Sequence, residues 1–505
     1  MPTPHHPPTS RPRRRAGWIA ALAAAVLAVP VLGAPAAVAA PGDPAVASSF
    51  DLKPGPDLRG VVTSLKAALP TQGVQELLDQ GNRVAKTGAS CATDPFGTGD
   101  NGAVLAPARK LCWDAGDAAT EEWIPQGITG VSDAQADELW GTRKPLVTAW
   151  YDKASAALCS ADSGTCPDKG VRLSFLDPET PVPGTPDGRR YRHVLLVEPY
   201  VNSYGNASYR AVDVHAGGIA WYKYHLYVAD TMNGLRVFDM RSLLDLNPDQ
   251  NASVDDTTLN GLKSNVTDEG KIGRQSNVYY GHTYRYVLPQ VASYRFAAAQ
   301  GNSSAGTCVA TGAPKASYIS IDRSAPAAPA LIMGEYCNSD AAHPEKGRVG
   351  ALPVDDATGL LRESGGRVAA TSAYHLPRDL TQGAARYDGT YYFNRSYLDN
   401  SGSLRRATVT GGRLVDLGGN ITNAVGPEDL YVEHGQSVPG GGTRYLWSLT
   451  EHRADTTAGC TDAGSPCGRV VYAHRLSDVL ARPLRRIRRR ERRPVRGACS
   501  GSTPG

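Results

Sequence analysis

The sequence predicts an all-β fold of the β-propeller class, with five to six four-stranded blades and a short helical N-terminal segment. Short β-type runs separated by turn residues recur along the chain, and three of the recurrences keep the same step between their first and second strands. A small antiparallel sheet cannot bury its own faces. Repeated copies are therefore expected to pack side by side around an axis.

The clearest copy lies at residues 214–246. An apolar run, AGGIAW, is followed by an alternating run at 225–229 and by a returning run at 235–240. The turn between the last two, DTMNG, ends in Asn-Gly, a pair favoured in hairpins because both residues tolerate positive φ. Three strands joined by tight turns make most of one blade.

Four further copies are expected along the chain. In the three middle copies the step from first to second strand runs from 218 to 226, from 278 to 286 and from 383 to 391. A sixth blade is expected within 192–214 or from the joined chain ends, and a pair of β-sandwiches is the alternative architecture. The copies begin at 125–128, 216–219, 276–279, 382–384 and 427–430.

Residues 1–39 have the features of a signal peptide. Four arginines precede an apolar run from Trp18 to Leu32, and the small residues Ala-Val-Ala end at Ala39, where we expect cleavage. The apolar run is too short to span a membrane. We therefore expect a secreted, extracellular protein without a membrane span.

The remaining chain divides into three parts by composition. Residues 40–113 are expected to form an extended and helical segment, with two short amphipathic helices broken at Pro70. Residues 114–481 form the expected propeller, and residues 482–505 a basic disordered tail with nine arginines and one glutamate. Because the tail and the signal peptide hold the excess of arginine, the body between them is acidic, which argues against nucleic-acid binding.

Nine cysteines fit an oxidising compartment, where disulfides persist. Eight of them fall into near neighbours in sequence, and local pairing is the simplest expectation. The ninth, Cys499, lies in the tail. The expected pairs are Cys91 with Cys112, Cys159 with Cys166, Cys308 with Cys337, and Cys460 with Cys467.

Polar residues at the start of each copy are the candidate site. Radial packing brings equivalent positions of all blades to one mouth of a central channel, a natural place for a ligand or a hard metal ion such as calcium. In such a mouth His215 is a candidate general base that Glu428 orients. The alternative is that these groups bind only water and each other. The candidates are Gln126, His215, Asn277, Gln382, Glu428 and Asp429.

The stretch YHLYVADTMNGLRVFDM resembles blades of secreted six-bladed propellers of the gluconolactonase-like and YWTD/NHL-like kind, and of uncharacterised secreted propellers of actinobacteria. The resemblance implies a divalent metal held by Glu, Asn and Asp at the channel mouth. Only Glu428 and Asn277 match that set, whereas Gln126, His215 and Gln382 depart from it.

The function expected from these features is a binding or scaffold propeller that holds a ligand at its channel mouth. The sequence carries no GxSxG, HExxH or GxGxxG motif. The alternative is a metal-dependent hydrolase of lactones or esters, and the sequence names no cofactor beyond a divalent metal such as calcium. The expected partner is a protein, a glycan or a small ligand, with no nucleic acid and no membrane, and the expected state is a monomer.

Overall fold

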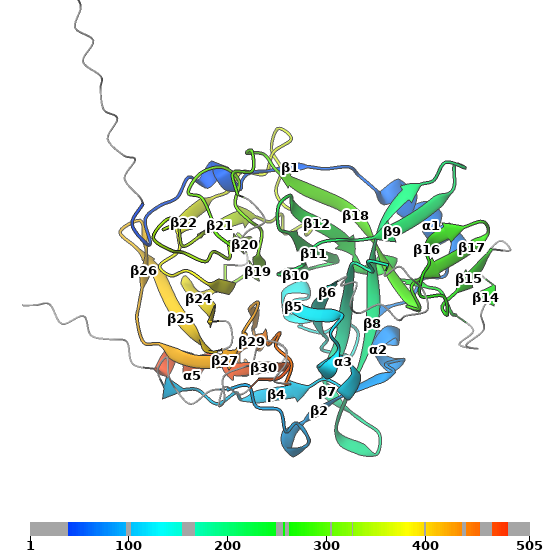
Figure 1. The fold of residues 1–505 in the computed structure, drawn as a ribbon, viewed down its shortest axis with the longest axis horizontal. Coiled ribbons are helices and arrows are strands. Elements are labelled where there is room, and N and C mark those ends of the chain that lie inside the picture. The colour runs from blue at the N-terminus through cyan, green and yellow to red at the C-terminus, as the bar shows by residue number, and fades with distance from the viewer. Residues whose placement is uncertain are drawn as a thin grey trace, which may run out of the picture. The chain divides into compact units, whose positions relative to one another are not determined.

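Five blades of antiparallel strands surround a common centre, where β5, β10 and β19 lie (Figure 1). The computed structural model describes residues 39–96, 103–153, 167–248, 256–257, 262–302, 306–325, 327–397, 400–436, 441–454 and 467–482. The expected signal peptide and nearly all of the expected basic tail lie outside these residues, as do Cys159, Cys166 and Cys460.

The first three blades follow one another along the chain, and each has four antiparallel strands paired in sequence order, with an insertion before the outer strand of the second blade. Blade 1 consists of β5 (Trp123–Gly130), β6 (Leu146–Asp152), β7 (Val171–Val182) and β8 (Thr185–Val201), with β9 (Ala207–Ala211) added at its edge. Blade 2 consists of β10 (Ile219–Tyr222), β11 (His225–Asp230), β12 (Gly234–Asp239) and β18 (Tyr286–Phe296). Blade 3 consists of β19 (Tyr318–Asp322), β20 (Ala330–Gly334), β21 (Arg348–Pro353) and β22 (Ser372–His375).

The last two blades also take strands from the N-terminal segment. Blade 4 consists of β23 (Thr381–Tyr387), β24 (Thr390–Tyr397), β25 (Asn400–Thr410) and β27 (Ile421–Val425), with β26 (Arg413–Asp416) and β3 (Ala103–Val104) at its edges. Blade 5 consists of β28 (Tyr431–Glu433), β29 (Tyr445–Leu449), β30 (Val470–Arg475) and β4 (Arg109–Cys112).

Strand β4 therefore closes the ring, because it comes from the N-terminal segment and completes the last blade. Strand β2 (Arg83–Thr87) pairs with both β4 and β8 and so joins blade 5 to blade 1. The disulfide Cys91–Cys112 fixes the end of β4. The expected boundary at residue 113 thus does not separate the segment from the propeller sheets.

The innermost strands of the five blades contact one another in a ring. Their backbones approach too closely for side chains at two positions. A Cβ on Gly218 would lie 2.2 Å from the backbone nitrogen of Ile319, and one on Gly383 would lie 2.7 Å from the carbonyl oxygen of Glu428. Glycine at the start of these strands is therefore a packing requirement of the axis.

The N-terminal segment folds largely outside the ring. Two short helices, α1 (Arg59–Ala68) and α2 (Val74–Asp79), flank Pro70 as the spacing of their apolar residues predicts. Strand β1 (Leu52–Pro54) pairs with β18. The other helices are η1 (Ala47–Phe50), η2 (Gly88–Ser90), α3 (Ala115–Ala119), α4 (Val131–Ala134), η4 (Met240–Ser242) and α5 (Leu476–Ala481).

Two expectations about the repeats are wrong. The chain between β12 and β18 does not start a blade, because it forms an insertion with its own small sheet. The run at 286–288 is therefore part of the outer strand of blade 2. The run at 318–322 is the innermost strand of blade 3. The stretch 192–214 holds no sixth blade, because it belongs to β8 and β9 of blade 1. The insertion contains β13 (Leu244–Asp245), β14 (Asp256–Thr257), β15 (Lys263–Asn265), β16 (Ile272–Gln275) and β17 (Val278–Gly281).

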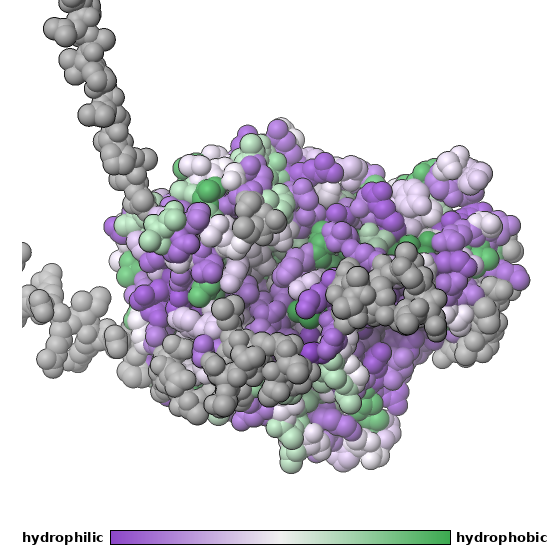
Figure 2. All heavy atoms as spheres, in the orientation of Figure 1, coloured by the Kyte–Doolittle hydropathy of each residue, from purple (hydrophilic) through white to green (hydrophobic). Residues whose placement is uncertain are grey.

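The core lies between neighbouring blades, where strand faces pack against each other. Trp150, Trp221 and Trp447 are all fully buried in it. On the face shown in Figure 2, hydrophilic side chains cover much of the coloured surface and hydrophobic ones appear in small groups. A second disulfide, Cys308–Cys337, joins the approach to blade 3 with the chain after β20. Cys467 is also disulfide-bonded.

Candidate functional site

The candidate site is one end of the axis, called the mouth here, where the innermost strands begin. First and second strands of a blade run antiparallel, so the end of each second strand lies at the same edge as the start of the first. The mouth therefore collects residues from both places in every blade. Its residues are Gln126 and Tyr151 of blade 1, His215 of blade 2, Tyr336 of blade 3, Gln382 of blade 4, and Glu428 and Glu451 of blade 5.

Two carboxyl groups of blade 5 form the polar centre of the mouth. The side chains of Glu428 and Glu451 are hydrogen-bonded to each other. Glu451 Oε2 also accepts a hydrogen bond of 2.8 Å from Gln126 Nε2 of blade 1. Glu428 is 1% exposed, and its Oε1 has no hydrogen-bond partner within the described part of the chain. Burial, reinforced by the charge of Glu451, raises the pKa of Glu428 well above its usual range, which favours the neutral form of this carboxyl group.

The side chain of Asp429, the next residue, binds the backbone of the innermost strands. Its Oδ2 accepts hydrogen bonds from the backbone N–H groups of Ile128 and Ile219, each at 3.2 Å, and so connects the innermost strands of blades 1, 2 and 5. Burial raises the pKa of Asp429 well above its usual range, although these backbone donors lower it. Its Oδ1 has no partner among the described residues and can therefore carry the proton.

Aromatic rings form the wall of the mouth. Tyr151 and His215 stack with ring centroids 4.4 Å apart and an interplanar angle of 29°. The side chain of His215 is exposed to solvent, yet burial among the surrounding residues lowers its pKa, as expected for a group in a recess. Burial raises the pKa of Tyr151 and of Tyr336, and both hydroxyls also respond to the charges of Glu428 and Glu451, which places all four groups in one electrostatic neighbourhood.

Arg469 balances the charge of the mouth. Its Nε donates a hydrogen bond of 2.8 Å to the backbone carbonyl of Glu451. Burial lowers the pKa of Arg469 to about 10, so the group stays cationic near pH 7. Arg469 therefore places a positive charge beside the carboxyl groups of Glu428 and Glu451.

The structure brings most of the sequence candidates together but not Asn277. Gln126 lies within β5, Gln382 lies at the start of β23, and His215, Glu428 and Asp429 lie just before β10 and β28, whereas Asn277 is exposed in the turn between β16 and β17. There its Oδ1 accepts a hydrogen bond of 3.2 Å from Arg274. The corresponding start in blade 3 is Ser317, before β19. Asn277 was predicted in place of Ser317 because the insertion in blade 2 was taken for the start of the third copy.

Sequence reasoning missed Tyr151, Tyr336 and Glu451. All three lie at, or within two residues after, the end of a second strand. That position is a usable signal, because the end of a second strand shares a sheet edge with the start of the first strand.

A serine, a histidine and an aspartate also form a chain inside blade 1. His193 Nδ1 lies 2.9 Å from Ser174 Oγ, and His193 Nε2 lies 3.0 Å from Asp117 Oδ2. However, Ser174 is fully buried, and the Asp117 carboxylate also accepts hydrogen bonds from Arg172 and Tyr191. A nucleophile must reach its substrate, so we interpret this chain as part of the packed interior.

Among the residues that the structure describes, no group of three or more His, Cys, Asp or Glu side chains is placed to hold a metal ion. No helix within the described ranges is long and apolar enough to cross a membrane.

The sequence matches no protein-family model and no curated protein. Three solved structures share weak similarity with the chain. Two are structures of the GH43_1 enzyme from Xanthomonas citri, and each covers 71% of this chain and 90% of that enzyme. The complex with xylose has a TM-score of 0.28 and 9% identity, and the other structure has a TM-score of 0.29 and 8% identity. The third is a mutant Aleuria aurantia lectin with alpha-methyl-L-fucoside, at a TM-score of 0.25 and 9% identity, covering 65% of this chain and 72% of the lectin. Because every TM-score is below 0.5, these similarities carry no argument about this chain.

Proposed function

We propose that this protein is a ligand-binding propeller whose mouth takes a neutral, hydroxyl-rich ligand such as the end of a glycan. The observation that carries the proposal is the buried Glu428 carboxyl group, which holds an unpartnered oxygen beside Glu451. A buried polar atom without a partner is costly, and water or a ligand hydroxyl would satisfy it.

The charge of the mouth favours a neutral ligand. The neutral acid of Glu428 can donate a hydrogen bond, while Glu451 and the amide oxygen of Gln126 can accept. Hydroxyl groups both donate and accept, so they suit such a mixed set. The stacked rings of Tyr151 and His215 offer a planar wall for the apolar face of a sugar ring.

The experiment is calorimetric titration of the purified protein with a panel of neutral hexose and pentose oligosaccharides. Glu428→Leu removes both oxygens and is expected to lower the affinity at least about tenfold, the lower end of the cost of an unpaired buried group. Glu179→Gln serves as the matched control, because Glu179 is a half-exposed carboxylate on β7 paired with Arg109. Equal affinities of wild type and Glu428→Leu, or no binding of any oligosaccharide, would contradict the proposal.

A hydrolase is the second candidate, and one observation favours it. A carboxyl group whose pKa is raised by burial beside an ionised partner has the property of a general acid. In glycosidases, however, the two carboxyl groups stand at least about 5 Å apart. Glu428 and Glu451 are in hydrogen-bonding contact, so a glycosidase of that type fits less well than an ester or lactone hydrolase. Product release during incubation with the same oligosaccharides and with simple lactones separates catalysis from binding.

A further inference from the structure

A second polar pocket lies on blade 2, away from the mouth. The N-terminal segment pairs with β18 as an additional strand through β1. Beyond β1, the N–H of Gly55 donates to Ser293 O at 2.7 Å and the N–H of Leu58 donates to Val291 O at 2.9 Å. Pro56 between them has no N–H to give, so the segment bends away from the strand at this point.

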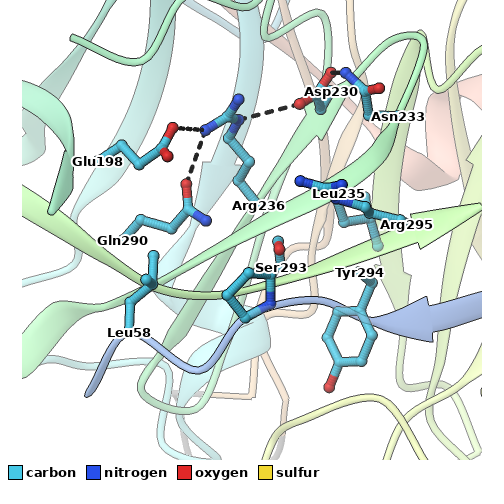
Figure 3. Close-up of a pocket in the computed structure, with 11 residues that line it drawn as sticks. Leu58, Glu198, Asp230, Asn233, Leu235, Arg236, Gln290, Ser293, Tyr294 and Arg295 are labelled. Atoms are coloured by element: carbon cyan, nitrogen blue, oxygen red, sulfur yellow. Dashed lines mark hydrogen bonds and ion pairs between the residues drawn. The ribbon is translucent and has the colours of Figure 1, made fainter. Parts of the chain in front are cut away.

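The bend leaves a cavity of about 180 Å³ between the segment, blade 2 and the edge of blade 1 (Figure 3). This volume corresponds to roughly six water molecules at about 30 Å³ each. The walls combine two residues of the segment, Pro56 and Leu58, with residues of the four strands β8, β11, β12 and β18. The lining residues are Pro56, Leu58, Glu198, Asp230, Asn233, Leu235, Arg236, Gln290, Ser293, Tyr294 and Arg295.

The charges at the top of the pocket are paired with one another. Arg236 donates from Nη1 to Glu198 at 2.9 Å and to Gln290 Oε1 at 3.0 Å, and from Nε to Asp230 at 3.1 Å (Figure 3). Asn233 donates to the other oxygen of Asp230 at 2.8 Å. Glu198 is also paired with Arg210, so both carboxylates of the lining are paired with arginine, and Arg295 adds a further cation.

The same residues keep spare hydrogen-bonding atoms. Among the described residues, nothing hydrogen-bonds to Arg236 Nη2, to Gln290 Nε2 or to Asn233 Oδ1. Gln290 is 4% exposed and accepts from Arg236 through Oε1, so its side chain is held in the pocket wall with the Nε2 donor free to bind a ligand. The hydroxyl of Ser293 adds a group that donates and accepts.

We propose that this pocket is a second binding site, for a neutral polyhydroxyl ligand no larger than one sugar ring. Because the carboxylates of the pocket are already paired with arginines, the site does not need an ionic ligand. The free donors on Arg236 and Gln290 and the free acceptor on Asn233 can bind adjacent hydroxyl groups of a ligand. The apolar side chains of Pro56 and Leu58 face the opposite wall, which suits the C–H face of a sugar. The site is independent of the mouth, because it shares no residue with it.

The test uses the full chain and a panel of free monosaccharides. Hydrogen–deuterium exchange locates the binding, and the expected result is slower exchange at residues 230–236 and 290–295 when the sugar is added. Gln290→Leu and Asn233→Ala are each expected to lower the affinity at least about tenfold. Gln275→Leu is the matched control, since Gln275 is exposed on β16.

Three outcomes would overturn the proposal: no monosaccharide slows exchange in either segment, both pocket variants bind as well as the wild type, or sulfate or acetate binds there instead and Arg295→Ala abolishes that binding. Glu428→Leu separates the two sites. Protection at blade 2 that survives this substitution belongs to the pocket, even if the mouth binds no ligand.

Discussion

The carboxylate of Asp429 accepts a hydrogen bond of 3.2 Å from the backbone N–H of Ile219, 210 positions earlier in the chain. The same oxygen accepts from Ile128, so one side chain holds the innermost strands of three blades at the axis. Asp429 is fully buried and follows Glu428 directly. The residue that ties the ring together therefore also fixes the backbone that carries the mouth carboxyl group.

We expect Asp429→Ala to destabilise the protein by roughly 2–6 kcal/mol, because it leaves two buried N–H donors without an acceptor and each costs about 1–3 kcal/mol. Asp429→Asn keeps an acceptor oxygen of the same shape and should cost clearly less. Urea unfolding of the two variants and the wild type measures both effects. Equal losses for Ala and Asn would show that the carboxamide cannot replace the bonds to Ile128 and Ile219.

Close approach of the innermost strands gives a second prediction. In Gly218→Ala the new Cβ would lie 2.2 Å from Ile319 N and 2.6 Å from Tyr318 Cα, both backbone atoms that cannot rotate away. We expect a loss of about 3 kcal/mol or more in the free energy of unfolding. Gly60→Ala is the control, since this glycine lies in α1 with no atom within 4 Å, and it should gain about 0.5–1 kcal/mol. A neutral Gly218→Ala would mean that the ring is looser than the structure shows.

Much of this architecture could be predicted from the sequence, because most blade strands are set by local features. Turn residues and short β-type runs gave the first three strands of blades 1, 2 and 4 and correctly pointed to an antiparallel, radially packed fold. The exact number of blades could not be predicted, because it depends on pairing between strands that are far apart in the sequence. The run at 286–288 pairs with β12 across an insertion, and β4 pairs with β30 across nearly the whole chain. Neither pairing leaves a trace in residue spacing.

The site was predictable in part for the same reason. Gln126, His215, Gln382 and Glu428 each lie at or next to the start of an expected copy, which the recurrence in the sequence reveals. The insertion shifted the register of the third copy and gave Asn277 in place of the start before β19. The spare hydrogen-bonding atoms of the blade 2 pocket depend on where Pro56 bends over β18, and only the folded chain determines that contact.

Part of the acid sensitivity should come from buried histidines whose pKa burial lowers to about 4, namely His474 and the His193 of blade 1. Burial, with the charge of Arg172, lowers the pKa of His193 from 6.5 to about 4, so the folded protein holds it neutral while the unfolded chain protonates it below pH 6.5. Stability is therefore lost as pH falls from 6.5 towards 4, by roughly 3 kcal/mol over the whole window. His193→Gln should flatten the stability profile between pH 7 and 5.

The control for His193→Gln is a substitution of a histidine outside the core. His343 is half-exposed, and His343→Gln should leave the pH profile of unfolding as in the wild type. If His193→Gln keeps the full acid dependence, the loss of stability arises from other groups.

The last prediction concerns Glu428 and has the opposite sign. Its folded pKa is raised above the ordinary value of 4.5, so above pH 4.5 the unfolded chain releases a proton that the folded protein keeps. The unfolded state then binds fewer protons, and stability falls as pH rises towards the folded pKa, by up to about 1.4 kcal/mol per pH unit. Glu428→Gln removes this dependence and keeps the shape of the side chain. We therefore expect the variant to gain stability relative to the wild type between pH 5 and 8 in urea unfolding. Asp429 is present in both proteins, so its own contribution to the pH dependence is not part of the difference between Glu428→Gln and the wild type. A constant difference across this range would mean that Glu428 is ionised in the folded protein, and the mouth would then carry a net negative charge and prefer a cationic ligand.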